Sequence, residues 1–367
     1  MRRTPALIVG GGPAGATAAL LLARAGCPHL LIERDAETGD ALCGGFLSWR
    51  TLDTLAALGI AADALNPDCV TRVRLFAGGR IAEAPLPRPA RGVSRRRLDS
   101  LLLARAADAG AAIERGVAVA AAEPGGVRLR DGTPIAADAL FLATGKHELR
   151  GLARPAAARG DDPCLGLRVR LGPSPALDHM IGDAIELHLV ARGYAGIVRQ
   201  EDGTANLCMA IRCSRLLAAG SPAALLDRLG NDHPALGERL AARRGGAADA
   251  VANIPYGWRA ERGAPGLFRL GDQAGVIPSL AGEGLGIAIA SGVRAAAAWR
   301  SAGAAGAVGY QRRLARDLAR PMALAGLVRR GMEAPASARA LVALAGLAPG
   351  LIDIIARLTR IRHSPID

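Results

Sequence analysis

Apolar and polar residues alternate in blocks along the chain, beginning with a strand-length apolar run directly before a cluster of glycines. Ala6 to Val9 is apolar, Gly10 to Gly15 is rich in glycine, and an alanine- and leucine-rich stretch with helical character follows. A second apolar run, Leu30 to Ile32, ends on Glu33. This order predicts a strand, a tight turn, a helix and a second strand.

The glycines have the spacing G-x-G-x-x-G, and each has its own role in holding a dinucleotide. Gly10 permits the turn, Gly12 lets backbone N–H groups approach a pyrophosphate, and Gly15 lets the helix pack closely on the strand. Pro13 suits a first helical turn, because its missing N–H has no partner there. Glu33 lies where a carboxylate accepts hydrogen bonds from a ribose diol. The candidate dinucleotide-binding residues of this unit are Gly10, Gly12, Pro13, Ala14, Gly15, Glu33 and Arg34.

Later blocks of helical and strand-like pattern predict an α/β fold with two lobes. Helices are expected over residues 49–58, 94–109, 221–243 and 284–299, and strands over 70–87, 113–121, 127–129, 139–143, 165–171, 184–190, 196–199, 205–211 and 267–270. The remainder is expected to be helical, with breaks at Pro321, Pro335 and Pro349. We therefore expect a Rossmann-like nucleotide lobe from residues 1–67, 92–155 and 260–333, an inserted mixed β-sheet substrate lobe from 68–91 and 156–259, and C-terminal helices over 334–367.

A second glycine-rich segment favours a flavin over a nicotinamide dinucleotide. An expected strand delivers Gly271 and Asp272, where an acid can bond a polyol, and a loop with Pro278 leads to Gly282-Glu283-Gly284 at the start of another helix. The N–H groups and dipole of that helix would stabilise negative charge on a reduced flavin. The buried strand that ends at Gly145 also lets the backbone pass close to a cofactor.

Composition excludes several classes of protein. The chain has 367 residues, of which 50% are hydrophobic and 3% aromatic, and its net charge is +13. The basic side chains are arginines spread over the whole chain apart from Lys146, with few aromatic platforms for bases, so a nucleic-acid partner is not expected. Six cysteines without a C-x-x-C pair indicate neither a metal site nor a disulfide framework and are expected to be mostly buried thiols in a reducing cytoplasm. No apolar run of about 18 residues appears, so a membrane-spanning helix is not expected.

The motifs in their order resemble the para-hydroxybenzoate-hydroxylase-like FAD oxidoreductases, and C-G-G at Cys43 and P-S-L-A-G-E-G resemble the geranylgeranyl reductase subfamily. The resemblance implies FAD as the cofactor, with Arg95 reaching its phosphate or ribose side and Asp272 holding the ribityl chain. It places Cys43 to Gly45 and Pro278 to Gly284 around the isoalloxazine ring. The further candidate cofactor-binding residues are thus Cys43, Gly44, Gly45, Arg95, Gly145, Gly271, Asp272, Pro278, Gly282, Gly284 and Leu285.

Two departures from the resembled families bear on the reaction. Prenyl reductases carry a W-x-F-P-like run where this chain has R-G-Y-A-G-I-V-R at 192–199, and halogenases need a lysine earlier than Lys146. We therefore expect hydroxylation of an aromatic, polyketide- or quinone-like molecule with reduced FAD and O₂. Reduction of C=C bonds in an isoprenoid lipid and a non-catalytic FAD electron carrier stay open as alternatives. The expected reductant is NAD(P)H binding transiently, or else an electron-donor protein.

Two residues are catalytic candidates, and one segment is a candidate for surface contacts. Cys43 is a candidate proton donor, with a space-filling buried thiol as the alternative, and Tyr194 could bond a substrate oxygen, with a core tyrosine as the alternative. The apolar, arginine-bearing stretch from Ala338 to Arg362 predicts a helical pair packed on the body. Its alternative is a membrane-surface element that admits a lipid-like substrate, which would make the protein peripheral at a membrane.

Overall fold

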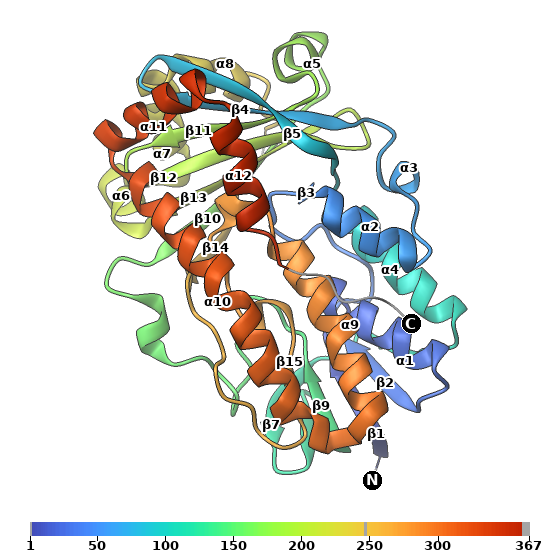
Figure 1. Ribbon diagram of the computed structural model, residues 1–367. Coiled ribbons are helices and arrows are strands. Elements are labelled where there is room, and N and C mark those ends of the chain that lie inside the picture. The colour runs from blue at the N-terminus through green and yellow to red at the C-terminus, as the bar shows by residue number, and fades with distance from the viewer. Residues whose placement is uncertain (1, 246–247, 362–367) are drawn as a thin grey trace.

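The computed structural model describes residues 2–245 and 248–361 and has two lobes, each built around one sheet (Figure 1). The first sheet has seven strands in the order β6-β2-β1-β9-β8-β7, with β15 paired to β9. Its strands are β1 (Arg2–Val9), β2 (His29–Glu33), β6 (Ala112–Arg115), β7 (Val119–Glu123), β8 (Gly126–Leu129), β9 (Pro134–Leu142) and β15 (Leu267–Arg269). Because β1 pairs in parallel with β2 and β9, the predicted strand-turn-helix-strand unit forms the centre of this sheet.

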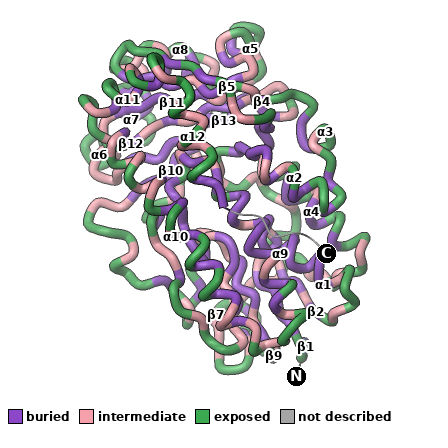
Figure 2. Tube along the Cα trace, in the orientation of Figure 1, coloured by how far each residue is buried: buried purple, intermediate pink, exposed green. Residues whose placement is uncertain are grey.

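Helices α1 (Pro13–Arg24), α4 (Arg95–Asp108) and α9 (Gly284–Ala302) pack together on the first sheet. Small residues set the distance between α1 and α9, because a Cβ on Gly292 would lie 2.5 Å from the carbonyl oxygen of Ala14. The alanine- and glycine-rich composition thus serves close helix packing. Figure 2 shows buried chain running through these helices and the centres of both lobes.

The second sheet has eight strands in the order β14-β10-β13-β12-β11-β4-β5-β3. They are β3 (Phe46–Leu47), β4 (Val70–Ala77), β5 (Arg80–Gly92), β10 (Cys164–Leu171), β11 (Ala184–Val190), β12 (Gly193–Arg199), β13 (Ala205–Arg212) and β14 (Asp249–Ile254). Every pair is antiparallel except β4 with β11, so the sheet is mixed as predicted. The sequence analysis missed β3 and β14, which are a two-residue strand and a mostly exposed edge strand.

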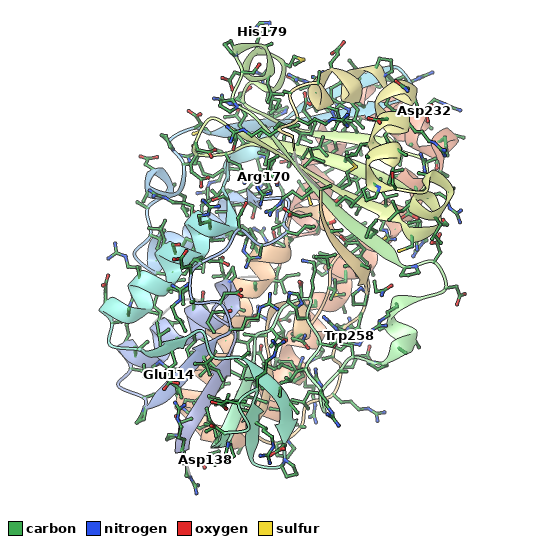
Figure 3. All side chains as sticks on the ribbon, turned by 180° about the vertical axis from the view of Figure 1, so that it is seen from behind. Glu114, Asp138, Arg170, His179, Asp232 and Trp258 are labelled. Carbon is green, nitrogen blue, oxygen red and sulfur yellow. The ribbon has the colours of Figure 1, made fainter. Side chains whose placement is uncertain are left out.

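Two sets of helices cover the second sheet. The first set is α5 (Pro175–Ile181), α6 (Cys213–Ala219), α7 (Pro222–Asp232) and α8 (Pro234–Leu240). The second set is the end of α10 (Gly306–Glu333) with α11 (Pro335–Leu347) and α12 (Gly350–Leu358). Seen from behind, His179 and Asp232 mark the outer end of this lobe, and Glu114 and Asp138 mark the opposite end of the molecule (Figure 3). The prediction of an α/β fold with two sheets and a helical C-terminus is confirmed.

Two predicted helix boundaries were wrong. The expected helix over 221–243 is divided into α7 and α8 at His233, because a residue that precedes a proline is disfavoured in the α conformation. Conversely, Pro321 does not break α10, which continues through it. Pro321 is buried, as are Leu318 and Met322 beside it, so tertiary packing outweighs the roughly 3 kcal/mol that an internal proline costs. Arg362 and the rest of the expected C-terminal segment after residue 361 lie outside the described residues.

Candidate functional site

A cavity lies between the two lobes, and both lobes contribute to its walls. On the nucleotide side it is lined by Gly12, Pro13, Ala14, Cys43, Gly44, Gly45, Arg95, Gly145, Lys146, Gly271, Asp272, Gly282, Gly284 and Leu285. On the opposite side it is lined by Ile185, Leu187, Tyr194, Gly196, Val198, Cys208, Ile254, Tyr256 and Ser279. The structure therefore brings together most residues that the sequence analysis assigned to a dinucleotide and a flavin.

The turn between β1 and α1 requires its glycines. Gly10 has a φ of 109°, and a Cβ there would lie 2.5 Å from the carbonyl oxygen of Ala143. A Cβ on Gly15 would lie 2.0 Å from the carbonyl oxygen of Gly10. These two glycines shape the turn without lining the cavity, whereas Gly12 and Pro13 line it. Because α1 has no side-chain cap, its first N–H groups are available to a phosphate.

Glu33 ends β2 beside this turn and is half-buried. Its carboxylate accepts hydrogen bonds from the backbone N–H groups of Gly11 at 2.5 Å and Asp35 at 3.0 Å. These bonds fix the carboxylate and leave further acceptor positions for a ribose hydroxyl. Neither Glu33 nor Arg34 lines the cavity itself, but Arg34 is placed differently, because its side chain is exposed and contacts Asp35 and His147 rather than the glycine turn. The structure therefore does not bring Arg34 to the site.

Arg95 projects from the first turn of α4 over the glycine turn. Its Nη2 lies 3.3 Å from the position that a Cβ on Gly12 would take. Asp99, one helical turn later, accepts hydrogen bonds from Nε at 2.9 Å and Nη2 at 2.6 Å. Burial lowers the pKa of Arg95, but Asp99 outweighs burial, so the pKa is raised and the guanidinium stays charged. A fixed, partly shielded cation thus faces the predicted phosphate position.

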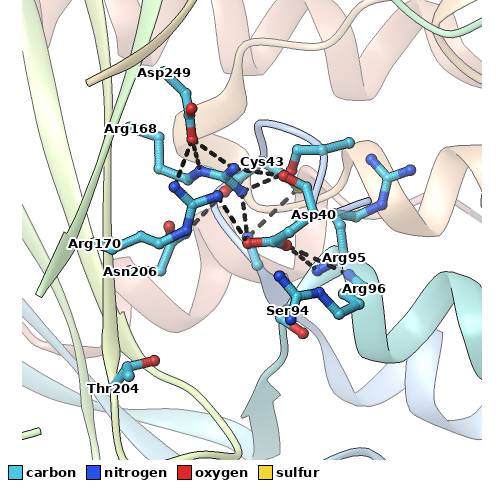
Figure 4. A network of polar contacts seen from close by, with 12 residues as sticks. Asp40, Cys43, Ser94, Arg95, Arg96, Arg168, Arg170, Thr204, Asn206 and Asp249 are labelled. Atoms are coloured by element: carbon cyan, nitrogen blue, oxygen red, sulfur yellow. Dashed lines mark hydrogen bonds and ion pairs between the residues drawn. The ribbon is translucent and has the colours of Figure 1, made fainter. Parts of the chain in front are cut away.

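The second sheet holds the loop that presents Cys43 to the cavity (Figure 4). Asn206 on β13 donates hydrogen bonds through Nδ2 to the carbonyl oxygens of Cys43 at 2.8 Å and Gly44 at 3.0 Å. The buried Arg168 on β10 forms an ion pair with Asp40 at 3.0 Å and donates to the carbonyl oxygen of Ala41 at 3.0 Å. Side chains from the substrate lobe therefore position a loop of the nucleotide lobe.

Asp272 lines the cavity at the end of β15 and faces the only lysine of the chain. Its carboxylate lies 3.3 Å from Nζ of Lys146, and this negative charge is the main reason why the pKa of Lys146 is raised. The neighbouring Gly271 donates its N–H to Oγ of Ser291 at 2.8 Å, which fixes the turn against α9. The position suits a carboxylate that bonds the hydroxyl groups of a polyol.

Glu283 precedes α9 but does not face the cavity. It is fully buried and accepts hydrogen bonds from Oγ of Ser48 at 3.4 Å and the N–H of Ile361 at 3.1 Å. Arg360 lies 3.2 Å from its carboxylate, against the ring of Trp49 at 5.2 Å from the ring centroid. Burial lowers the pKa of Arg360. The C-terminal segment thus holds the start of α9, whose Gly284 and Leu285 line the cavity.

On the opposite side of the cavity, three hydroxyl groups form a cluster. The Oη atoms of Tyr194 and Tyr256 lie 2.5 Å and 2.6 Å from Oγ of Ser279. Burial raises the pKa of both tyrosines, so both phenols remain protonated at neutral pH. Burial also raises the pKa of the Cys208 thiol, to about 12.

Gly196 lies in the middle of β12 between these groups, and no backbone contact explains why it is a glycine. A Cβ there would meet Leu187, Cys208 and Tyr194 at 3.5 to 3.7 Å, which are ordinary van der Waals distances. Gly193 on the same strand differs, because a Cβ there would lie 2.5 Å from the carbonyl oxygen of Ala210. The glycine at position 196 therefore adds space to the cavity.

The residues on the nucleotide side fit an FAD. The N-termini of α1 and α9 both lack a side-chain cap and both begin at residues that line the cavity, so each offers N–H groups to an anion. Gly45 has a φ of 73°, and a Cβ there would lie 2.7 Å from the carbonyl oxygen of Val93. The loop after Cys43 can therefore take this conformation only with a glycine at position 45. Glu33, Arg95 and Asp272 would hold the ribose, diphosphate and ribityl groups.

Comparisons with known proteins agree with this fit. A family model described as an FAD binding domain matches residues 3–150. Digeranylgeranylglycerophospholipid reductase 2 from Methanopyrus kandleri is 27% identical over 317 residues, which cover 78% of this chain and 74% of that protein. The protein is an FAD-dependent oxidoreductase.

Solved structures of similar fold include both a reductase-like protein and an enzyme of another class. A geranylgeranyl bacteriochlorophyll reductase-like protein from Thermoplasma acidophilum has a TM-score of 0.73 and 21% identity, with 99% of this chain and 94% of that chain covered. A protein described as a probable FAD-dependent monooxygenase from Pseudomonas aeruginosa has a TM-score of 0.69 and 17% identity, with 92% and 98% covered. These likenesses show that the oxidoreductase shares its fold with both classes.

Sequence reasoning missed the residues that reach the site of this oxidoreductase from distant segments. Tyr256 and Cys208 line the cavity, and Asn206 and Arg168 hold the Cys43 loop. An alternation of apolar and polar positions along β13 could have indicated which of its residues share one face of the sheet. It could not have indicated that this face lies toward the predicted position of the flavin. Pro278 is buried between lining residues without lining the cavity itself.

Proposed function

We propose that this FAD-dependent oxidoreductase reduces carbon–carbon double bonds in an isoprenoid-type lipid. The observation that carries the proposal is the chemistry of the wall opposite the nucleotide side. Ile185, Leu187 and Val198 give this wall an aliphatic part beside the hydroxyl groups of Tyr194, Tyr256 and Ser279, and the described residues that line it include no carboxylate or histidine. A phenol that must be deprotonated before hydroxylation needs a general base on this wall, whereas binding of an aliphatic chain needs only apolar side chains there.

The names of two similar proteins support the same reaction. The Methanopyrus protein is named as a reductase of a digeranylgeranylglycerophospholipid, and the Thermoplasma structure is described as reductase-like toward a geranylgeranyl group. Both names contain a long, branched and unsaturated hydrocarbon. The sequence analysis placed hydroxylation first, and the apolar wall moves reduction ahead of it.

The residues of the chain would supply a proton and a dry pocket. Bound reduced FAD supplies a hydride, and NAD(P)H or an electron-donor protein would reduce the FAD again. Reduction adds this hydride and one proton across the double bond, so a proton donor must face the substrate. We assign this role to Cys43, because its loop lines the cavity and is fixed by Asn206. The aliphatic wall excludes water, which protects the hydride from wasteful protonation.

Hydroxylation remains a second candidate because of the hydroxyl cluster of Tyr194, Ser279 and Tyr256. These groups could orient the oxygen of a quinone- or phenol-like molecule without ionising it. The added space at Gly196 would then accept the ring.

Product analysis separates the two reactions. We would reduce the FAD-loaded protein with dithionite in the absence of O₂ and add vesicles that contain a geranylgeranyl glycerophospholipid. Reduction predicts reoxidation of the flavin together with lipids that gain two hydrogen atoms per double bond in mass spectra. Two results together would favour hydroxylation. The flavin would stay reduced when the lipid is added without O₂, and under air a quinone-like substrate would gain one oxygen atom. NAD(P)H oxidation that no substrate accelerates would favour the electron carrier.

Substitution of Cys43 tests the proton donor. Cys43→Ala should lower turnover at least ten-fold and change its pH profile, with FAD content unchanged, and Cys43→Ser should restore part of the rate. Cys69→Ala removes an exposed thiol away from the cavity and provides the matched control. Equal turnover and equal pH profiles in the Cys43→Ala and Cys69→Ala variants would exclude Cys43 as the donor.

A further inference from the structure

Helices α11 and α12 place an unusual number of apolar side chains in solvent. Eight large apolar residues are exposed in the described chain, and five of them lie on this helix pair. They are Leu344, Leu347, Leu351, Ile354 and Leu358, which we call the outer apolar face. Leu347 is 86% exposed. Monomeric proteins rarely leave such a concentration of apolar side chains uncovered without a binding partner.

The inner side of the same helix pair packs on the wall of the cavity. Val342 and Ile352 belong to an apolar cluster that also contains Leu187, Tyr194 and Leu280, which line the cavity. Figure 1 shows α11 and α12, in red, against β4 and β5 of the second sheet. The helix pair thus separates the substrate side of the cavity from the exterior by one layer of helix.

The charges around the outer apolar face are positive. Arg339 on α11, Arg80 on β5 and Arg330 on α10 are exposed, and none of them forms an ion pair within the described part of the chain. Both β5 and α10 pack against α11, so the three arginines lie on α11 or on elements packed against it. In α11 and α12 the single acidic residue, Asp353, is neutralised by Arg357 at 2.8 Å. The surroundings therefore attract anions.

Aliphatic side chains with surrounding arginines fit a lipid surface better than a protein. Protein interfaces concentrate tryptophan and tyrosine, and the outer apolar face contains neither. A second copy of the chain would bring the same arginines together, and each copy has a net charge of +13. An anionic bilayer accepts leucines into its headgroup region, and each nearby arginine adds electrostatic attraction to it.

We propose that the outer apolar face docks on the surface of an anionic lipid bilayer. Docking places the substrate side of the cavity next to the bilayer, so that, given the proposed function, a lipid chain can pass between them. Within residues 2–245 and 248–361 no single helix can span a membrane, and α11 and α12, which satisfy the length and composition only together, are bent by 113°. The geometry therefore points to helices that lie in the surface.

Vesicle flotation tests the docking without requiring turnover. The FAD-loaded protein should float with vesicles of phosphatidylglycerol and phosphatidylcholine, and float much less with phosphatidylcholine alone or at high salt. The double variant Leu347→Glu, Ile354→Glu should reduce binding to anionic vesicles at least ten-fold. Leu217→Glu, at a position 81% exposed on α6, should bind like the wild type. FAD absorbance checks that each variant is folded.

Several outcomes would overturn the proposal. The first is a wild type that stays in the soluble fraction with anionic vesicles, and the second is equal binding by the double variant and Leu217→Glu. A concentration-dependent dimer that the double variant abolishes, without vesicle binding, would assign the face to a second copy. Vesicle binding that persists although no lipid is reduced would count against the proposed function and leave the docking intact.

Discussion

Replacing Glu186 by glutamine should destabilise the substrate lobe by about 3–5 kcal/mol, because it removes the acidic partner of a buried ion-pair network and leaves the basic partners in place. Glu186 lies on β11 between Ile185 and Leu187, whose side chains line the cavity, while its own side chain is fully buried on the reverse face. Nε and Nη2 of Arg239 each donate to its carboxylate at 2.9 Å. Glutamine keeps the shape but removes the negative charge, so buried cations lose their partner.

The pKa of Glu186 gives a second measure of the same magnitude. Burial alone would raise this pKa, but hydrogen bonds from His188 and Arg239 outweigh burial and lower it from 4.5 to about 2. At about 1.4 kcal/mol per pKa unit, this difference corresponds to roughly 3 kcal/mol of stability. Because the pKa in the folded state lies below the ordinary value, this stability is fully present above pH 4.5 and is lost as the pH falls toward about 2.

Urea unfolding followed by far-UV circular dichroism measures the effect, with the FAD-loaded proteins at pH 7 and with the wild type and Glu186→Gln also at steps from pH 4.5 to 2. Glu83→Gln is the matched control, since Glu83 pairs with Arg74, which also contacts Glu186, but its side chain is 32% exposed. We expect at most about 1 kcal/mol there. Equal losses in the two variants, or a stability difference between wild type and Glu186→Gln that does not narrow between pH 4.5 and 2, would refute the reasoning.

Three further substitutions test the cavity. Glu33→Ala should weaken FAD retention at least ten-fold relative to Glu37→Ala, because hydrogen bonds to a charged group contribute about 1.5–3 kcal/mol; equal FAD occupancy in the two purified proteins would argue against the ribose assignment. Gly12→Val should yield protein without FAD, because a side chain at this cavity-lining position would take the place of the diphosphate beside Arg95, whereas Gly39→Val, with nothing within 4 Å, should retain FAD. A flavin spectrum in the Gly12 variant would contradict this. Gly196→Leu should keep FAD but lower kcat/KM at least five-fold for a bulky substrate, because overfilling the cavity costs about 1–3 kcal/mol. An unchanged kcat/KM would show that the substrate does not use this space.

The glycine turn, which we expect to hold the adenosine half of FAD, could be predicted from the sequence because its geometry is local. Gly10, Gly15 and Glu33 belong to one strand-turn-helix-strand unit, and their steric requirements follow from backbone geometry. The same holds for the turn at Gly271. Where a tertiary contact overrides a local preference, the pattern fails, as at Pro321, whose buried neighbours keep α10 continuous.

The flavin and substrate ends depend on contacts between distant segments, which no local pattern contains. Glu283 was expected to belong to a loop around the flavin, but it binds the N–H of Ile361, 78 residues away, and does not face the cavity. Tyr256 lies in a segment without a recognisable strand pattern and meets Tyr194 only through Ser279. These partners were therefore absent from the predicted site.

The contact of the C-terminal segment with Glu283 has a consequence for how the protein matures. During synthesis the turn around Gly12 and the carboxylate of Glu33 leave the ribosome long before Glu283, and Ile361 follows 78 residues after Glu283. Of the partners of Glu283 in the described residues, Arg360 and Ile361 join its carboxylate only then. The start of α9, which borders the proposed site of the chemistry, therefore gains these contacts only after 78 further residues have been made, whereas Gly11 and its partner Glu33 belong to one short unit of the chain.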